Sequence, residues 1–126
     1  METPKVLALD FGTVRIGCAV SYGTLAEPLC IIGNTDKMYG EISELIQTYG
    51  IQLILVGMSE RASAERAYFF GETVKKMTGI PVSYADETLS THSARRKLRE
   101  QNKVVPVVDH FAAAEFLQEW LDGHDS

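Results

Sequence analysis

A short, almost entirely apolar segment that runs directly into a carboxylate is the strongest constraint on the fold of this chain. Val6–Leu9 (VLAL) precedes Asp10, and this segment is too short and too rich in β-formers to be a helix. A second apolar segment, Ile16–Val20, follows the turn residues 11–13, so the two segments predict an antiparallel hairpin. A carboxylate at the end of a central strand is costly unless it is solvated, hydrogen-bonded or bound to a metal ion. Asp10 is therefore the first candidate for a functional residue.

Length and composition predict one soluble globular domain over residues 1–126. Apolar residues make up 45% and charged residues 23% of the chain, which is ordinary for such a domain. No apolar segment approaches the roughly 20 residues of a membrane span, and METPKV does not resemble a signal peptide. We therefore expect a cytoplasmic protein with no membrane partner. The net charge of −5 argues against non-specific coating of nucleic acid, but it permits a local basic surface.

The order of the predicted elements indicates an α/β fold. After the hairpin the sequence predicts, in order, a strand over Ala26–Ile32, a helix ending at Gly50, a strand over Ile51–Val56, a helix over about 64–78, a strand over Pro81–Ala85, a helix over Thr91–Glu100 and a helix over Asp109–Leu121. Three consecutive strands followed by strand–helix alternation predict a five-stranded mixed sheet. In this sheet three strands are antiparallel, the next two are parallel, and helices cover both faces.

Three local patterns refine this prediction. Pro28 lacks a backbone donor and favours an edge position for the third strand. Cys18 and Cys30 would face each other if the chain turns near residues 23–24, and we expect them to be free, buried thiols. The buried face of the second helix is expected to carry Ala67, Phe70, Val74 and Met77.

Three acidic residues from distant parts of the chain, Asp10, Glu87 and Asp109, lie at boundaries of predicted elements. Sites in open α/β sheets lie outside the carboxyl ends of the parallel strands, so these carboxylates are expected to converge if the last helix packs beside the first strand. Converging carboxylates repel one another unless cations neutralise them, and hard oxygen ligands suit Mg²⁺ or Mn²⁺. Two such ions about 3.5–4 Å apart would activate water and stabilise the leaving oxygen in phosphodiester hydrolysis. Two simpler interpretations stay open: Asp109 could only cap the last helix, and Glu87 could be a solvated turn residue.

A basic stripe is predicted beside this acidic group. His92, Arg95, Arg96, Arg99 and Lys103 recur at helical spacing along the third predicted helix and just past its end. The stripe begins near Glu87, where a phosphate backbone would pass to reach bound metal ions. A solvated helix face with no ligand is the alternative interpretation.

Three motifs, taken together and in order, resemble the YqgF/RuvX family of RNase H-like nucleases. They are LDFGTVRIGCAV near the start, ADETLSTHSA in the middle and VVDHFAAAEFLQEWL near the end. Members of this family are described as Holliday junction resolvases or as nucleases that process the 5′ end of pre-16S ribosomal RNA. The resemblance implies an RNase H-like fold with metal-binding, catalytic carboxylates at Asp10, Glu87 and Asp109. Thr88 stands where the family usually has arginine, and the loop after Gly57 is shorter than is usual in the family.

Several functions remain open from the sequence. The first is a nuclease acting on structured RNA, and the second is a resolvase of branched DNA, which should be a dimer because a four-way junction has two-fold symmetry. The third is a non-catalytic RNA-binding factor with the same fold. Residues 10–13 also resemble a phosphate-binding loop of actin-like and hexokinase-like ATPases, but the chain is too short for their two lobes. Nucleic acid is the expected partner, and we expect a monomer or a weak homodimer.

Overall fold

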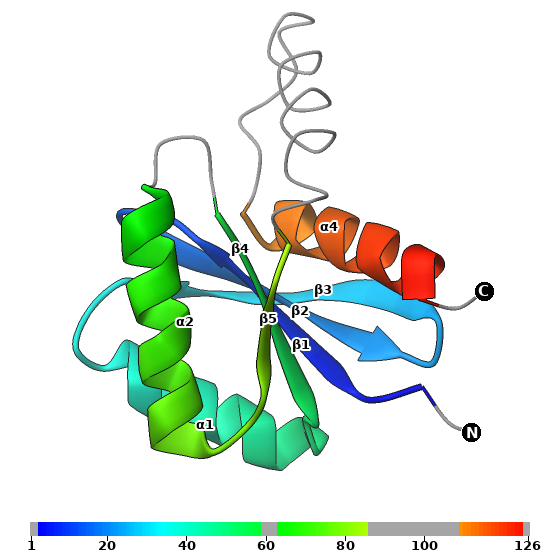
Figure 1. Cartoon of the computed structure of the whole chain (residues 1–126), viewed down its shortest axis with the longest axis horizontal. Coiled ribbons are helices and arrows are strands. Elements are labelled where there is room, and N and C mark those ends of the chain that lie inside the picture. The colour runs from blue at the N-terminus through cyan, green and yellow to red at the C-terminus, as the bar shows by residue number, and fades with distance from the viewer. Residues whose placement is uncertain (1–2, 59–62, 86–108, 125–126) are drawn as a thin grey trace, which may run out of the picture.

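The computed structural model describes residues 3–58, 63–85 and 109–124, and they form a mixed β-sheet with helices on both faces (Figure 1). The strands are β1 (Val6–Phe11), β2 (Arg15–Tyr22), β3 (Leu25–Gly33), β4 (Leu53–Met58) and β5 (Val82–Tyr84). The helices are α1 (Met38–Tyr49), α2 (Ala64–Thr78) and α4 (Asp109–His124). The predicted helix over Thr91–Glu100 falls outside the described residues.

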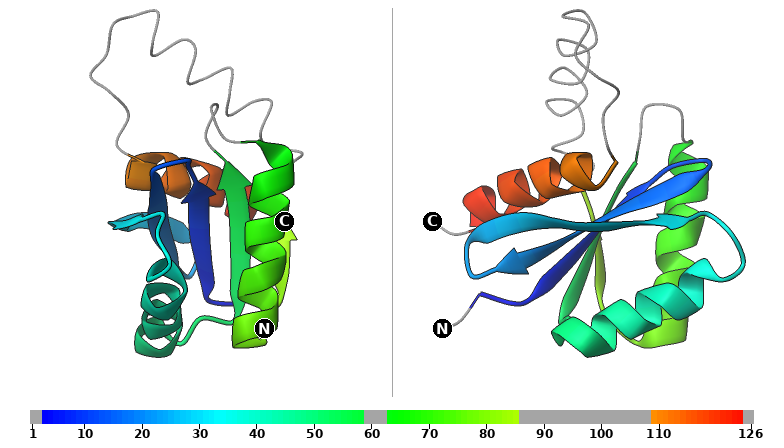
Figure 2. Two further views of the ribbon diagram at one scale, coloured as in Figure 1. Left: turned by 90° about the vertical axis from the view of Figure 1, so that its left-hand side faces the viewer. Right: turned by 180° about the vertical axis from the view of Figure 1, so that it is seen from behind.

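The five strands lie in the order β3-β2-β1-β4-β5, with β1 in the centre. β2 pairs antiparallel with both β1 and β3, whereas β4 pairs parallel with β1 and with β5. Helices α1 and α2 cover one face of the sheet and α4 covers the other (Figures 1 and 2). The predicted fold class, three antiparallel strands followed by two parallel ones, is confirmed.

The two faces of β1 contribute to two separate hydrophobic clusters. Leu7, Leu9 and Phe11 pack in the cluster beneath α1 and α2, and Val6 and Ala8 pack in the cluster beneath α4. Each of these five side chains is buried. A strand covered on both faces needs apolar residues at consecutive positions, which explains the uninterrupted apolar segment at the start of the sequence.

The helix boundaries follow local capping chemistry. Gly50 and Gly79 end α1 and α2 in left-handed conformations, with φ of 63° and 74°. The Ser63 hydroxyl caps α2 by accepting a hydrogen bond of 3.0 Å from the backbone N–H of Arg66. In the described part of the chain, no helix has the length and apolar character needed to cross a membrane.

The prediction that Met77 is buried was wrong, because its side chain is 59% exposed. Ala67, Phe70, Gly71 and Val74 form the buried face of α2. Met77 lies seven residues beyond the buried Phe70 and within about 20° of it around the helix, so its angular position does not account for its exposure. Met77 lies in the last turn of α2, which ends at Thr78, and apolar spacing alone did not show where along the helix the buried face ends.

Cys18 and Cys30 are direct partners in the pairing of β2 with β3, and both thiols are free, as predicted. Cys18 is buried as expected, whereas Cys30 lies on the edge strand and is only partly buried. A side-chain hydrogen bond with Cys18 lowers the pKa of the Cys30 thiol to about 7. The same hydrogen bond, together with burial, raises the pKa of Cys18 well above its ordinary range. The register shifts immediately after Cys18, so that Ala19 pairs with Pro28 on what is an edge strand, as predicted.

Candidate active site

One edge of the sheet collects the carboxyl ends of β1, β4 and β5. Because these three strands are parallel, their carboxyl ends necessarily lie on the same side. The amino-terminal ends of α2 and α4 lie at this same edge, as the side view in Figure 2 shows. In open α/β sheets this edge is where ligands bind.

Asp10 lies near the carboxyl end of β1 and is only 1% exposed. By strand alternation it shares the α4 side of the sheet with Val6 and Ala8. Its partners on the two neighbouring strands are both glycines, Gly17 on β2 and Gly57 on β4. Cross-strand partners project to the same face, so Asp10 has no side chain directly beside it on either neighbouring strand.

Helix α4 packs closely over this part of the sheet. A Cβ atom added to Gly57 would lie 2.8 Å from two ring carbons of Phe116, so the Phe116 ring occupies the space above the glycine backbone. Ala112 and Ala113 are fully buried, and such small side chains allow a helix to approach a sheet closely. Asp10 therefore lies on the face of the sheet that α4 covers, and at 1% exposure an uncompensated charge there would be costly.

The second predicted carboxylate, Asp109, is the first residue of α4, as predicted. Position 109 precedes Ala113 by four residues and Phe116 by seven, so the three positions share one face of an α-helix. The Asp109 side chain itself falls outside what the structure describes.

The other predicted site residues lie outside the described residues. These are Glu87 and the basic stripe His92, Arg95, Arg96, Arg99 and Lys103. Ala85 is described: it is buried in the cluster beneath α4, and its backbone N–H donates a 2.9 Å hydrogen bond to the carbonyl of Val56. Within residues 3–58, 63–85 and 109–124 there is no group of three His, Cys, Asp or Glu side chains that could hold a metal ion. Of the predicted metal ligands, the structure thus describes the Asp10 side chain and the backbone position of Asp109.

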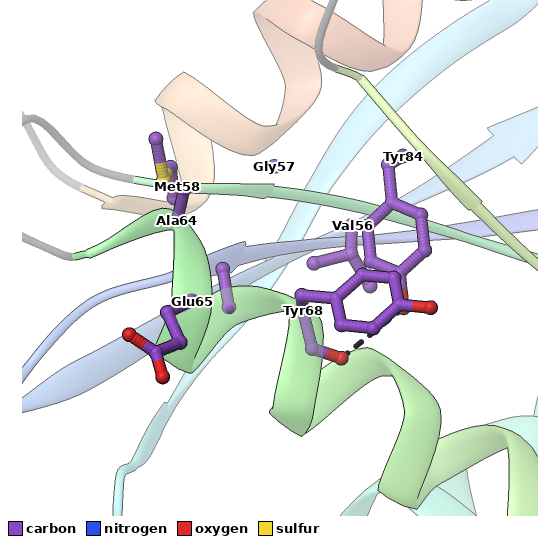
Figure 3. Close-up of a pocket in the computed structure, with 8 residues that line it drawn as sticks. Val56, Gly57, Met58, Ala64, Glu65, Tyr68 and Tyr84 are labelled. Carbon is purple, nitrogen blue, oxygen red and sulfur yellow. Dashed lines mark hydrogen bonds between the residues drawn. The ribbon is translucent and has the colours of Figure 1, made fainter.

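A hollow at the same edge was not predicted from the sequence. It has a volume of about 340 Å³ and lies between the end of β4 and the first turns of α2 (Figure 3). Its lining includes Gly57, Glu65, Tyr68 and Tyr84. The rings of Tyr68 and Tyr84 stack with centroids 5.2 Å apart, which makes an aromatic wall.

Hydrogen bonds hold this aromatic wall in place. The Tyr84 hydroxyl donates to the Glu72 carboxylate at 2.8 Å and also lies 3.2 Å from the Tyr68 carbonyl oxygen. Gly71 makes room for this arrangement, because a side chain there would meet the Tyr84 ring. A glycine inside a predicted helix was the available sequence signal, since it often marks a close approach of another group.

Comparison with known proteins gives a consistent result over nearly the whole chain. Residues 4–123 match the family model described as RuvX, Holliday junction resolvase. A protein of Anaeromyxobacter sp. (strain Fw109-5) is 36% identical over 133 residues, covering 94% of this chain and 97% of the relative. One of Streptococcus pneumoniae (strain D39) is 33% identical over 137 residues, with the same coverage. Both relatives carry the name "Putative pre-16S rRNA nuclease".

Two solved structures share the fold. The Thermus thermophilus RuvC complex with a Holliday junction substrate matches with a TM-score of 0.59 and 15% identity, covering 98% of this chain and 97% of that one. A second T. thermophilus RuvC structure has a TM-score of 0.58 and 14% identity, covering 96% of each chain. At these identities the match shows a common RNase H-like fold.

Proposed function

Since this chain belongs to the RuvX Holliday junction resolvase family, we propose that it is a metal-dependent nuclease that hydrolyses phosphodiester bonds in structured RNA. The proposed substrate is the 5′ end of the small-subunit ribosomal RNA precursor, in keeping with the names of its relatives. The activity would be carried by a single RNase H-like domain spanning residues 1–126, in the cytoplasm.

The observation that carries the proposal is the position of Asp10. Asp10, which is 1% exposed, lies at the edge where open α/β sheets bind ligands, between two glycines and on the face of the sheet that the helix beginning with Asp109 covers. A buried carboxylate costs little only when a cation or hydrogen-bond donors compensate its charge. This arrangement is expected of a residue that serves as a ligand.

The donor chemistry fits a divalent metal ion. Asp10 offers carboxylate oxygens, the hard ligands preferred by Mg²⁺ and Mn²⁺, and we propose that Glu87 and Asp109 complete the ligand set. Bound divalent ions supply Lewis acidity, which activates water and stabilises the leaving oxygen in phosphodiester hydrolysis. Helical periodicity supports the contribution of Asp109, because position 109 shares a face with the buried Ala113 and Phe116. Asp10 would hold its ligand firmly, since β1 is buried on both faces.

We propose that the basic stripe binds the phosphate backbone of the substrate. His92, Arg95, Arg96, Arg99 and Lys103 follow Glu87 closely in the sequence. If these residues neutralise phosphates, replacing Arg95 and Arg99 by glutamate should weaken binding and flatten its dependence on salt. An unchanged salt slope would identify the stripe as a solvated helix face.

The test of the proposed activity compares the wild type with Asp10→Asn. We expect the wild type to cleave precursor rRNA ends in Mg²⁺ or Mn²⁺ and the variant to be inactive while keeping its fold by circular dichroism. Asp36→Asn is the matched control, because it removes the same charge at an exposed position and should leave cleavage unchanged. Equal RNA binding by wild type and Asp10→Asn, with cleavage by neither, would instead identify a non-catalytic RNA-binding factor.

The second candidate is cleavage of branched DNA, which the description of the matching family model favours. Four-way DNA junctions should be assayed beside the RNA substrates under the same conditions. Symmetric cleavage of a junction requires paired sites, so this activity predicts a dimer in sedimentation experiments. A monomer that cleaves RNA and leaves junctions intact would eliminate this candidate.

A further inference from the structure

The first turns of α2 carry exposed aromatic side chains that the proposed chemistry does not use. Phe69 is 70% exposed and Tyr68 is 58% exposed. Large aromatic side chains at such exposure, side by side in one helix, are unusual in a surface that only meets water. They call for an explanation beyond the packing of the core.

A second hollow, larger than the one in Figure 3, opens beside these residues. It has a volume of about 710 Å³, within the range typical of sites for small ligands. Its aromatic lining consists of Phe11, Tyr39, Tyr68, Phe69 and Phe70. Polar residues also line it, including Arg66, Thr13 and Asn34.

Both hollows adjoin the strand positions next to Asp10. Tyr68 and Glu65 line the two hollows alike. The smaller hollow reaches Gly57, the β4 partner of Asp10, and the larger one reaches Phe11, the residue that follows Asp10 in β1. The two hollows beside the first turns of α2 therefore both extend to the proposed catalytic edge of the sheet.

We propose that this surface binds unpaired nucleobases of the substrate, which stack on Phe69 and Tyr68 next to the scissile region. This inference rests on the proposed function, since it assigns single-stranded nucleic acid as the substrate feature recognised beside the site. Bases of any sequence stack on aromatic rings, and unpaired bases are the ones whose faces are accessible. Tyr68 is already held against Tyr84, so little conformational freedom is lost when a base stacks on its outer face (Figure 3).

The charges around the larger hollow determine which part of a nucleotide enters it. Among the described residues that line it, Glu65 and Glu72 outnumber the one basic residue, Arg66, which disfavours a phosphate inside. A base is neutral, and its amino groups can donate hydrogen bonds to carboxylates. The phosphates of the bound strand would remain outside, and binding through this surface should therefore add little to the salt dependence.

The test measures binding of a short fluorescein-labelled single-stranded RNA and of a blunt duplex by fluorescence anisotropy. All proteins carry Asp10→Asn so that cleavage does not interfere. Phe69→Ala should weaken single-strand binding roughly five- to 150-fold, with an unchanged salt slope and unchanged duplex binding. Met77→Ala is the matched control, because Met77 is also an exposed apolar residue of α2 but lines neither hollow, and it should bind as before.

Unchanged single-strand binding in Phe69→Ala, or an equal loss for duplex and single strand, would overturn the inference. A second result would also overturn it: a protein that sediments as a dimer, and that Phe69→Ala converts to a monomer without changing RNA binding. The surface would then bind a second copy of the chain. These outcomes are independent of cleavage. If Asp10→Asn abolishes cleavage but Phe69→Ala binds RNA normally, this inference alone is rejected. If Phe69→Ala weakens binding but the wild type cleaves nothing, the proposed nuclease activity alone is rejected.

Discussion

Replacing Gly57 by alanine tests the packing of α4 over the proposed active site. The added Cβ would lie 2.8 Å from Cε2 and Cζ of Phe116 and 3.2 Å from Cδ2, whereas carbon atoms prefer about 3.5 Å or more. The ring must therefore retreat by roughly 0.7 Å. Phe116 is fully buried, so the ring cannot retreat without moving its neighbours or the helix itself.

We expect Gly57→Ala to lower the free energy of unfolding by about 1–2 kcal/mol. Overpacking a core costs about 1–3 kcal/mol, and replacing a strand glycine offsets up to about 1 kcal/mol of this. At this chain length the loss corresponds to a decrease in melting temperature of roughly 4–8 °C, measurable by circular dichroism. Gly40→Ala is the control: Gly40 is in α1, nothing lies within 4 Å of its added Cβ, and the change should be neutral or stabilising.

A double-mutant cycle identifies the cause of the loss. Phe116→Leu removes the ring atoms that the new Cβ would meet, so Gly57→Ala should cost less in the Phe116→Leu background than in the wild type. An unchanged melting temperature in Gly57→Ala, or strictly additive effects in the cycle, would refute the assignment of Phe116 as the cover over Gly57.

Three further predictions concern single side chains. Ser21→Ala should lower the free energy of unfolding by about 1–3 kcal/mol in urea denaturation, because the buried Ser21 hydroxyl accepts a 2.8 Å hydrogen bond from the Val6 backbone N–H. If the variant is as stable as the wild type, another acceptor replaces the hydroxyl. Tyr84→Phe should cost about 0.5–1.5 kcal/mol through the lost hydrogen bond to Glu72, and a Glu72→Gln variant should keep part of that bond. Alkylation of Cys30 by iodoacetamide should accelerate as the pH rises through about 7, because its lowered pKa makes it a thiolate above that pH, and Cys18 should react far more slowly. A pH profile centred near the ordinary thiol pKa would contradict the hydrogen bond between the two thiols.

The sheet could be predicted from the sequence because each strand carries its own local signal. The apolar segment before Asp10 has no polar alternation, which is characteristic of a strand buried on both faces, and β1 is such a strand. Pro28 marked the edge strand because it cannot donate to a neighbour, and Gly50 marked the end of α1 because the chain adopts positive φ there. These signals depend on the conformation of one residue or of one short segment.

The surroundings of Asp10 could not be predicted in the same way, because they depend on which residues meet across strands. Gly57 is distant from Asp10 in sequence, and even within the predicted hairpin only the pairing register places Gly17 beside Asp10. The aromatic wall similarly requires α2 and β5 to meet, since Tyr68 and Tyr84 belong to different elements. Helical periodicity predicted the buried side of α2 but assigned Met77 to it, because periodicity gives the angle of a side chain around a helix and not where along its length the buried face ends; Met77 lies in the last turn.

Because side chains alternate between the two faces of β1, the proposed catalytic carboxylate and the proposed base-binding surface lie on opposite faces of the sheet. Asp10 projects toward the α4 side, and Phe11, the next residue, projects toward α1 and α2. A strand of nucleic acid that crosses this edge can therefore present a phosphate to the carboxylate on one side while an adjacent unpaired base reaches the aromatic hollow on the other. Successive nucleotides are covalently linked, so a base held at Phe69 restricts which phosphate can reach Asp10. On this reasoning, stacking in the hollow would select the position of cleavage as well as strengthen binding, and removing the Phe69 ring should spread the cleavage products over neighbouring positions.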